Sequence, residues 1–192
     1  MSTATAKIVF LDRDGTINVD YGYVTSPDKL TLIPGAANAI AALNQNGFSL
    51  VIVTNQSAIA RGMATEEDVL KTNAALLEML REENPEALIS QVIYCPDHPD
   101  TPSDRRKPGI GMLRDLQEEL LNFDRQNSWM IGDKLSDIEF GKNAKLPKKH
   151  CVLVKTGSGE KEIGKLSDKE IEEITVVNCL TEATSVITTR QS

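Results

Sequence analysis

The stretch Phe10-Leu11-Asp12-Arg13-Asp14-Gly15-Thr16-Ile17-Asn18 joins an apolar run to two carboxylates that lie one residue apart. Residues 8–11 predict a short buried strand. In a strand, residues two apart point to the same side, so Asp12 and Asp14 can converge at its carboxyl end. Two like charges there indicate a bound cation, and Gly15 lets the chain turn away without a side chain. Taken alone, the stretch is equally consistent with an ordinary Asp/Gly turn.

The composition is typical of one globular domain. A chain of 192 residues is long enough for one well-buried core and short for two, so we expect a single domain over residues 1–192. No apolar run approaches the length of a membrane span, and residues 1–7 contain no signal-peptide core. The net charge of −7 argues against nucleic acid as a partner. Three widely spaced cysteines (Cys95, Cys151 and Cys179) favour reduced thiols in a cytoplasmic protein.

Strand-like and helix-like patterns alternate along the chain. Strands are predicted at residues 8–11, 48–53, 92–95, 128–131, 151–154 and 174–177. Helices are predicted at residues 36–46, 65–81, 108–122, 135–145 and 181–189, with loops at 18–34, 96–106 and 157–170. This alternation predicts an α/β fold with a mainly parallel sheet and helices on both faces. Sites in such folds lie outside the carboxyl ends of the strands.

Polar side chains follow four of these predicted strands. In chain order they are Asp12 and Asp14, then Thr54 and Asn55, then Arg106 and Lys107, and finally Asp133 and Asp137. Carboxylate oxygens are the ligands that Mg²⁺ prefers. A hydroxyl, backbone groups and a lysine can stabilise the charge on a phosphoryl group. The set therefore favours phosphate chemistry that depends on a divalent metal.

These motifs resemble, in the same order, the four motifs of the haloacid-dehalogenase-like (HAD) phosphohydrolases. They are Asp12-Arg13-Asp14-Gly15-Thr16, Thr54-Asn55, Lys107 and Gly132-Asp133-x-x-x-Asp137. Further segments are similar to the D-glycero-D-manno-heptose-1,7-bisphosphate 7-phosphatases, namely Asp20-Tyr21-Gly22-Tyr23-Val24, Thr54-Asn55-Gln56-Ser57, Ala60-Arg61-Gly62, Tyr94-Cys95-Pro96, Arg106-Lys107-Pro108 and Gly132-Asp133-Lys134. The resemblance covers nearly the whole chain and is weakest after residue 157. It implies a three-layer Rossmann-like HAD fold, and the short spacing between motifs leaves no room for a separate cap domain.

The resemblance also implies a role for each matching residue. Asp12 is expected to be the nucleophile that forms an aspartyl-phosphate, and Asp14 the general acid and then the base. Mg²⁺ is expected on Asp12, Asp133 and the backbone carbonyl of Asp14. Contacts with substrate and phosphate are expected from Asp20, Tyr21, Gly22, Tyr23, Thr54, Asn55, Gln56, Ser57, Arg106, Lys107 and Lys134. Asp137 lies one helical turn beyond Asp133, where it either caps the helix or orients Lys107.

The loop after the third predicted strand departs from many relatives, which carry a zinc site there. Cys95 stands at the first ligand position, but Asp97 replaces the expected histidine and residues 103–105 contain no cysteine. A structural zinc site needs four nitrogen or sulfur ligands. We therefore expect no structural zinc, and a loop stiffened instead by Pro96, Pro99 and Pro102.

The function expected from the resemblance is hydrolysis of the 7-phosphate of D-glycero-D-manno-heptose 1,7-bisphosphate, on the path to nucleotide-activated heptose. A histidinol-phosphate phosphatase shares much of the pattern and is the alternative enzyme. A non-catalytic phosphosugar-binding protein is the alternative of another class, although a binder does not need both Asp12 and Asp14. A polynucleotide 3′-phosphatase fits the acidic composition less well. We expect a cytoplasmic monomer with a small phosphorylated sugar as partner, and neither nucleic acid nor membrane.

Overall fold

A sheet of six parallel strands forms the centre of the protein in the computed structural model, which describes residues 5–190. The strands lie in the order β3-β2-β1-β4-β5-β6, and every neighbouring pair is parallel. Their bounds are β1 Lys7–Leu11, β2 Phe48–Asn55, β3 Gln91–Cys95, β4 Trp129–Gly132, β5 Cys151–Val154 and β6 Thr175–Val177. The predicted parallel α/β fold is therefore confirmed.

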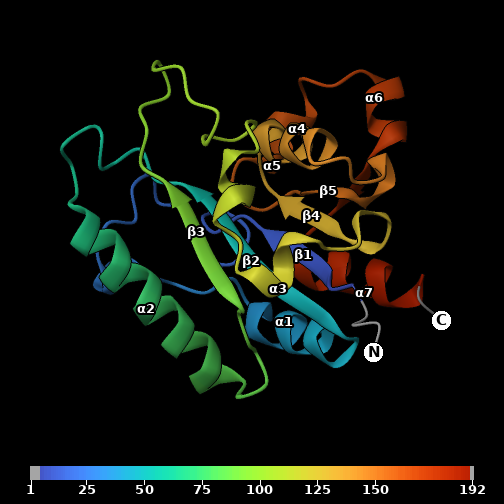
Figure 1. The fold of residues 1–192 in the computed structure, drawn as a ribbon, viewed down its shortest axis with the longest axis horizontal. Coiled ribbons are helices and arrows are strands. Elements are labelled where there is room, and N and C mark those ends of the chain that lie inside the picture. The colour runs from blue at the N-terminus through green and yellow to red at the C-terminus, as the bar shows by residue number, and fades with distance from the viewer. Residues whose placement is uncertain (1–4, 191–192) are drawn as a thin grey trace.

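Helices cover both faces of this sheet, which makes three layers (Figure 1). Helices α1, α2 and α7 pack on one face, and α3 and α4 pack on the other. Among residues 5–190, no helix has both the length and the apolar character needed to span a membrane. The helices are α1 Ala36–Gln45, α2 Glu66–Glu83, α3 Glu118–Leu121, α4 Leu135–Asn143, α5 Gly159–Ile163, α6 Asp168–Glu173 and α7 Leu180–Thr189, with short 3₁₀ turns at Pro27–Lys29, Gly111–Asp115, Arg125–Asn127 and Lys148–His150.

Strand β1 is buried from both sides. Val9 and Leu11 point into the core under α1, α2 and α7, whereas Ile8 and Phe10 point into the core under α3 and α4. All four side chains are fully buried. This is why the strand is a continuous apolar run rather than an alternation of apolar and polar residues. Its burial fixes where the chain emerges at Asp12.

The order of the strands places a crevice at the carboxyl end of β1. The chain builds β2 and β3 on one side of β1 and then crosses over to place β4 on the other side. The connections after β1 and β4 lead to helices on opposite faces of the sheet, α1 and α4, which opens a site in this kind of sheet. Leu11 of β1 pairs with Ile131 of β4, so Asp12 and Asp133 emerge side by side. The predicted location of the site rests on this topology.

The predicted helix over residues 108–122 is wrong. The segment forms a 3₁₀ turn at Gly111–Asp115, breaks, and then forms the single-turn helix α3. The side chain of Gln91 takes backbone partners from the break, because it donates to the Asp115 carbonyl at 2.7 Å and accepts from the Gln117 amide at 3.0 Å. These tertiary bonds replace the bonds of a continuous helix, which the glycine at position 111 also disfavours.

The predicted loop over residues 157–170 is also wrong, because α5 occupies residues 159–163 and α6 begins at Asp168. Ser167 caps α6 by accepting from the Glu170 amide, and the Glu170 carboxylate accepts from the Ser167 amide in return. This reciprocal capping pair was readable as Ser-x-x-Glu in the sequence. The abundance of charged residues concealed it.

The aromatic core under α3 and α4 gives a direct test of the packing. The Phe10 ring lies 5.3 Å from the Phe123 ring and 5.9 Å from the Phe140 ring, both edge-to-face. We expect Phe10→Ala to lower the free energy of unfolding by about 3–5 kcal/mol, and Tm by roughly 10 °C. Thermal unfolding followed by circular dichroism measures this shift. Leu121→Ala, which truncates a side chain on an exposed position, is the control, and equal shifts in both variants would contradict the assigned core.

Candidate active site

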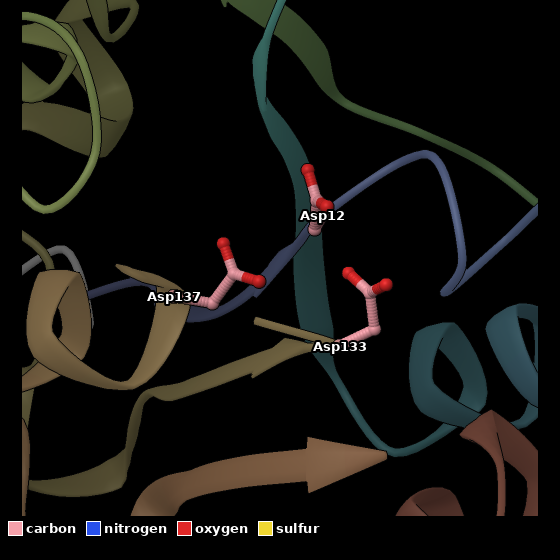
Figure 2. Close-up of side chains that lie close together, drawn as sticks. All are labelled: Asp12, Asp133 and Asp137. Atoms are coloured by element: carbon pink, nitrogen blue, oxygen red, sulfur yellow. The ribbon is translucent and has the colours of Figure 1, made fainter. Parts of the chain in front are cut away.

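Three carboxylates converge at the carboxyl ends of β1 and β4 (Figure 2). Asp12 follows β1, Asp133 follows β4, and Asp137 lies in the first turn of α4. One oxygen from each lies within 4.8 Å of the others, and all three residues are buried. Three buried negative charges at this separation repel one another strongly unless cations compensate for them. The nearby cations therefore decide what this cluster can do.

The Lys107 ammonium is the buried cation of the cluster. Its Nζ lies 2.8 Å from Asp12 Oδ1 and 2.6 Å from Asp137 Oδ1, and it donates to the Val53 carbonyl at 2.7 Å. An ammonium has three donors, and two hydrogen bonds together with the ion pair to Asp137 surround this one. Lys107 can therefore attract a phosphate through its charge, but a direct hydrogen bond to phosphate requires that one of these contacts be released. Its clearest contribution is to fix Asp12 and Asp137.

A reciprocal pair of hydrogen bonds fixes Lys107 itself. The Asn55 side chain donates to the Lys107 carbonyl at 3.2 Å and accepts from the Lys107 amide at 3.0 Å. Asn55 is the last residue of β2, so this pair fastens the loop after β3 to the end of the neighbouring strand. The sequence predicted that Asn55 contacts phosphate. The structure shows that its side-chain amide also holds the backbone of Lys107.

Asp14 lies in a ring of donors beside the carboxylate cluster. Its Oδ1 accepts from the side-chain amide of Asn18 at 2.9 Å. Its Oδ2 accepts from the side-chain amide of Gln56 at 2.9 Å and from Arg13 Nη2 at 2.8 Å. The fully buried Arg13 also donates to Asn73 Oδ1 of α2 at 2.8 Å. Asp14 is thus held at a defined place on the wall of the cavity, and Arg13 connects it to α2.

Backbone at the end of β5 closes around Asp133. The Ser158 amide donates to Asp133 Oδ2 at 2.7 Å, and the Thr156 hydroxyl donates to the Gly15 carbonyl at 2.6 Å. Gly15 and Gly157 both have a positive φ, and a Cβ on either one would overlap the Asp133 carboxylate. Only glycine allows the two backbones to approach this side chain so closely. The other oxygen, Asp133 Oδ1, is buried without a hydrogen bond among the described residues.

The pKa values follow from burial and from this arrangement of charges. Burial raises the pKa of Asp12, but the Lys107 and Lys134 cations outweigh it and leave the pKa below its ordinary value. Burial and then the Asp12 charge raise the pKa of Asp133 to about 7. Burial also raises the pKa of Asp137 to about 6, although Lys107 opposes this shift. Asp12 is therefore the member of the cluster whose ionised form is most strongly favoured at neutral pH without a metal.

A cavity of about 400 Å³ opens beside the cluster and gathers most of the predicted site residues. Tyr21 and Asp133 are the exceptions, and Tyr21 is 65% exposed. Asp133 lies buried next to the lining residue Lys134. Two lining residues, Val24 and Ser136, were not predicted. The predicted residues in the lining are Asp12, Asp14, Asp20, Gly22, Tyr23, Thr54, Asn55, Gln56, Ser57, Arg106, Lys107, Lys134 and Asp137.

Lys134 and Arg106 bring two further positive charges to the cavity wall. Lys134 Nζ lies 3.4 Å from Asp20 Oδ2 and 4.0 Å from Asp133 Oδ1. Burial lowers the pKa of Lys134, but the nearby aspartates led by Asp12 raise it by more, so Lys134 is charged at neutral pH. Arg106 is half-buried and donates from Nη1 to the Asp97 carbonyl at 3.2 Å. A cavity with these cations favours an anionic ligand.

The loop at residues 96–106 is held by side-chain hydrogen bonds, whereas we predicted stiffness from its prolines. Cys95 Sγ donates to Asp97 Oδ2 at 3.3 Å, and the Ser103 hydroxyl donates to the same carboxylate oxygen. Burial raises the pKa of the Cys95 thiol. At the positions compared with zinc ligands in the sequence, this chain thus holds a hydrogen-bonded cluster. The absence of a structural zinc stays a prediction.

Sequence reasoning missed the residues that support the cluster from a distance along the chain. Arg13 stands in the first motif but was given no role there, and Asn73, Thr156 and Ser158 belong to no motif that we recognised. The signal for Arg13 was its charge between Asp12 and Asp14, directly after an apolar strand. The signal for Thr156 and Ser158 was Gly157 between them, directly after β5. Both signals become specific only when the sheet order is known.

Comparisons with known proteins agree with this geometry. The HAD-hydrolase-like family model matches residues 104–183. A Chlorobaculum tepidum protein named D-glycero-D-manno-heptose-1,7-bisphosphate 7-phosphatase is 43% identical over 171 residues, which cover 83% of each chain. A Photorhabdus laumondii protein named as the corresponding β-anomer phosphatase is 44% identical, over 78% of this chain and 80% of its own. The solved D,D-heptose 1,7-bisphosphate phosphatase from B. bronchiseptica, complexed with magnesium and phosphate, has a TM-score of 0.84 and 29% identity, covering 96% of this chain and 99% of its own.

The raised pKa values predict how the stability of the metal-free protein depends on pH. Asp133 and Asp137 bind protons in the folded state that the unfolded chain releases near its ordinary pKa of 3.8. The stabilisation is therefore fully present below about pH 4 and is lost as the pH rises through about 7. In the presence of a chelator, we expect Tm to fall by several degrees between pH 5 and pH 8.

The isosteric variant Asp133→Asn is the matched control for this measurement. It keeps an oxygen to accept from the Ser158 amide but removes the group with the most clearly raised pKa. We expect its Tm to vary less with pH than that of the original chain. His150, whose pKa burial lowers, is common to both proteins and cancels from the comparison. Parallel pH curves for the two proteins would contradict the raised pKa assigned to Asp133.

Proposed function

The chain belongs to the HAD-like family of D-glycero-D-manno-heptose-1,7-bisphosphate 7-phosphatases, and on that premise we propose a catalytic role for each residue of its site. The protein is a Mg²⁺-dependent phosphatase that hydrolyses the 7-phosphate of a heptose 1,7-bisphosphate, on the path to nucleotide-activated heptose. One observation carries the assignment of residues. Asp12 and Asp133 converge at the switch point of the sheet, beside a lysine that holds Asp12 and a cavity lined by further cations.

The residues present fit a magnesium ion. Asp12 and Asp133 offer carboxylate oxygens within 4.8 Å of each other, and Asp133 Oδ1 is buried with no hydrogen-bond partner among residues 5–190. Such an oxygen is costly to bury unless it binds a cation. Asp137 is a less suitable metal ligand, because its carboxylate already contacts the Lys107 ammonium and the Lys134 backbone amide. Bound Mg²⁺ supplies positive charge that neutralises the carboxylates and the phosphoryl oxygens.

In the proposed first step, an Asp12 carboxylate oxygen attacks the phosphorus atom of the 7-phosphate. The bond between phosphorus and the sugar oxygen breaks, and the phosphoryl group is carried on Asp12 as an aspartyl-phosphate. The lowered pKa of Asp12 keeps this nucleophile ionised at neutral pH. Its contact with Lys107 at 2.8 Å fixes the direction from which the carboxylate meets the substrate.

Asp14 is the proposed carrier of the proton. It lines the cavity two residues beyond Asp12, on the wall formed with Gln56. Its carboxyl donates a proton to the departing sugar oxygen, and its carboxylate then takes a proton from the water that attacks the aspartyl-phosphate. The hydrolysis releases inorganic phosphate and restores Asp12. The donors that surround Asp14 set its position at both stages.

The remaining lining residues are proposed to hold the sugar and its two phosphates. Thr54 lies near the end of β2, and Gln56 and Ser57 follow this strand; these three are proposed to bind the reacting phosphate. Asp20, Gly22 and Tyr23 line the cavity from the loop after β1. Lys134 and Arg106 supply positive charge. We keep residues 1–192 as one catalytic domain in this proposal, although residues 1–4 and 191–192 lie outside the described part. We also propose a cytoplasmic monomer that acts without nucleic acid or membrane, consistent with the net charge of −7.

A panel of substrates tests the proposed function. Phosphate release is measured with Mg²⁺ on both anomers of heptose 1,7-bisphosphate, on histidinol phosphate and on fructose 1,6-bisphosphate. We expect kcat/KM for one heptose bisphosphate anomer to exceed the value for histidinol phosphate by roughly tenfold or more, because the site has cations for a second phosphate. A chelator should abolish release. A tenfold preference for histidinol phosphate would overturn the substrate assignment.

A further inference from the structure

Arg106 is the cavity cation that forms no ion pair among residues 5–190, so most of its donors can serve a ligand. Among residues 5–190, the cations that line the cavity are Arg106, Lys107 and Lys134. Lys107 contacts Asp12, Asp137 and a carbonyl, and Lys134 is paired with Asp20. The side-chain contact of Arg106 goes instead to the neutral Asp97 carbonyl, from one of five N–H donors. Its planar guanidinium suits a phosphate, which it can bind with two parallel bonds.

One hydroxyl fixes both ends of Arg106. Ser103 Oγ accepts from the Arg106 amide at 3.1 Å and from the Arg105 amide at 3.2 Å, which sets the backbone just before Lys107. The same hydroxyl donates to the Asp97 carboxylate. Asp97 is the residue whose carbonyl holds the Arg106 guanidinium. The backbone and the side chain of Arg106 are therefore both linked to the contact between Ser103 and Asp97, here named the Asp97–Ser103 clasp.

The clasp is anchored to the sheet. Cys95, the last residue of β3, donates from Sγ to the Asp97 carboxylate at 3.3 Å. The hydrogen bond from Ser103, followed by that from Cys95, keeps the pKa of Asp97 below its ordinary value, so the carboxylate is ionised and accepts strongly. The clasp thus closes the loop that begins at the end of β3 and delivers Arg106 to the cavity.

We propose that Ser103, acting with Asp97, is a positioning residue that aims Arg106 at the substrate phosphate that is not transferred. This rests on the proposed function, because only a bisphosphate presents a second phosphate after the first has entered between Asp12 and Asp133. Ser103 touches neither the nucleophile nor the carboxylate cluster among the described contacts. Its loss should therefore weaken binding of the bisphosphate and leave the chemical step intact.

The test compares Ser103→Ala with the original chain on two substrates, in the presence of Mg²⁺. For heptose 1,7-bisphosphate we expect KM to rise about tenfold while kcat stays within about twofold, the pattern of lost uniform binding. For p-nitrophenyl phosphate, which has a single phosphate, we expect kcat/KM to stay within about twofold. Retained activity on this small ester shows that the variant is folded and that its nucleophile is in place.

Two matched variants and a double variant sharpen the test. Ser103→Thr keeps the hydroxyl and should restore the original KM. Thr101→Ala removes an exposed hydroxyl from the same loop and should leave kcat and KM unchanged for both substrates. In a chain that already carries Arg106→Ala, adding Ser103→Ala should cause little further rise in KM, because the two residues act as one unit.

Three outcomes would overturn the proposal. They are an unchanged KM for the bisphosphate in Ser103→Ala, equal losses of kcat/KM on both substrates, and full additivity with Arg106→Ala. None of these outcomes would contradict the proposed function, because the proposed function is tested by the activity of the original chain alone. Failure of the original chain to hydrolyse the heptose bisphosphate would contradict the proposed function directly, and the positioning role would fall with it.

Discussion

The buried ammonium of Lys107 is the interaction on which the site depends. It lies between Asp12 and Asp137 at 2.8 and 2.6 Å, with the Val53 carbonyl as its third acceptor. Burial lowers the pKa of Lys107, yet the two carboxylates raise it by more, so the cation persists in the interior. Without this cation, two buried carboxylates would remain uncompensated beside a third, an arrangement that costs several kcal/mol. Lys107 therefore allows an ionised nucleophile to exist at the end of a buried strand.

The fold brings the partners of Lys107 together from distant parts of the chain. Asp12 directly follows β1, Val53 and Asn55 lie in β2, and Asp137 lies in the helix after β4. The parallel sheet aligns the ends of these strands, and the switch of strand order between β1 and β4 leaves room for a cavity. Gly15 and Gly157 admit two stretches of backbone against Asp133. The fold thus surrounds these buried carboxylates with the partners that a single strand end would lack.

The sequence predicted the elements and residues whose signals are local. Apolar runs gave the strands, and Asp12, Asp133 and Lys107 stood at their ends in a recognisable order. What it could not predict depends on tertiary partners. The helix expected over residues 108–122 is broken by hydrogen bonds from Gln91, and Arg13 reaches Asn73 sixty positions away. Lys107 was predicted as a phosphate ligand, which stays a prediction, and the geometry adds its contacts with Asp12, Asp137 and the Val53 carbonyl.

The most direct test of this account is to find where the phosphoryl group is carried during turnover. The protein is mixed with heptose 1,7-bisphosphate and Mg²⁺, quenched with acid within one turnover, digested and analysed by mass spectrometry. The account predicts a phosphate, labile to hydroxylamine, on the peptide that contains Asp12, and its absence together with loss of activity in Asp12→Asn. A phosphate on any other residue, or full activity in Asp12→Asn, would contradict the assignment of Asp12 as the nucleophile held by Lys107.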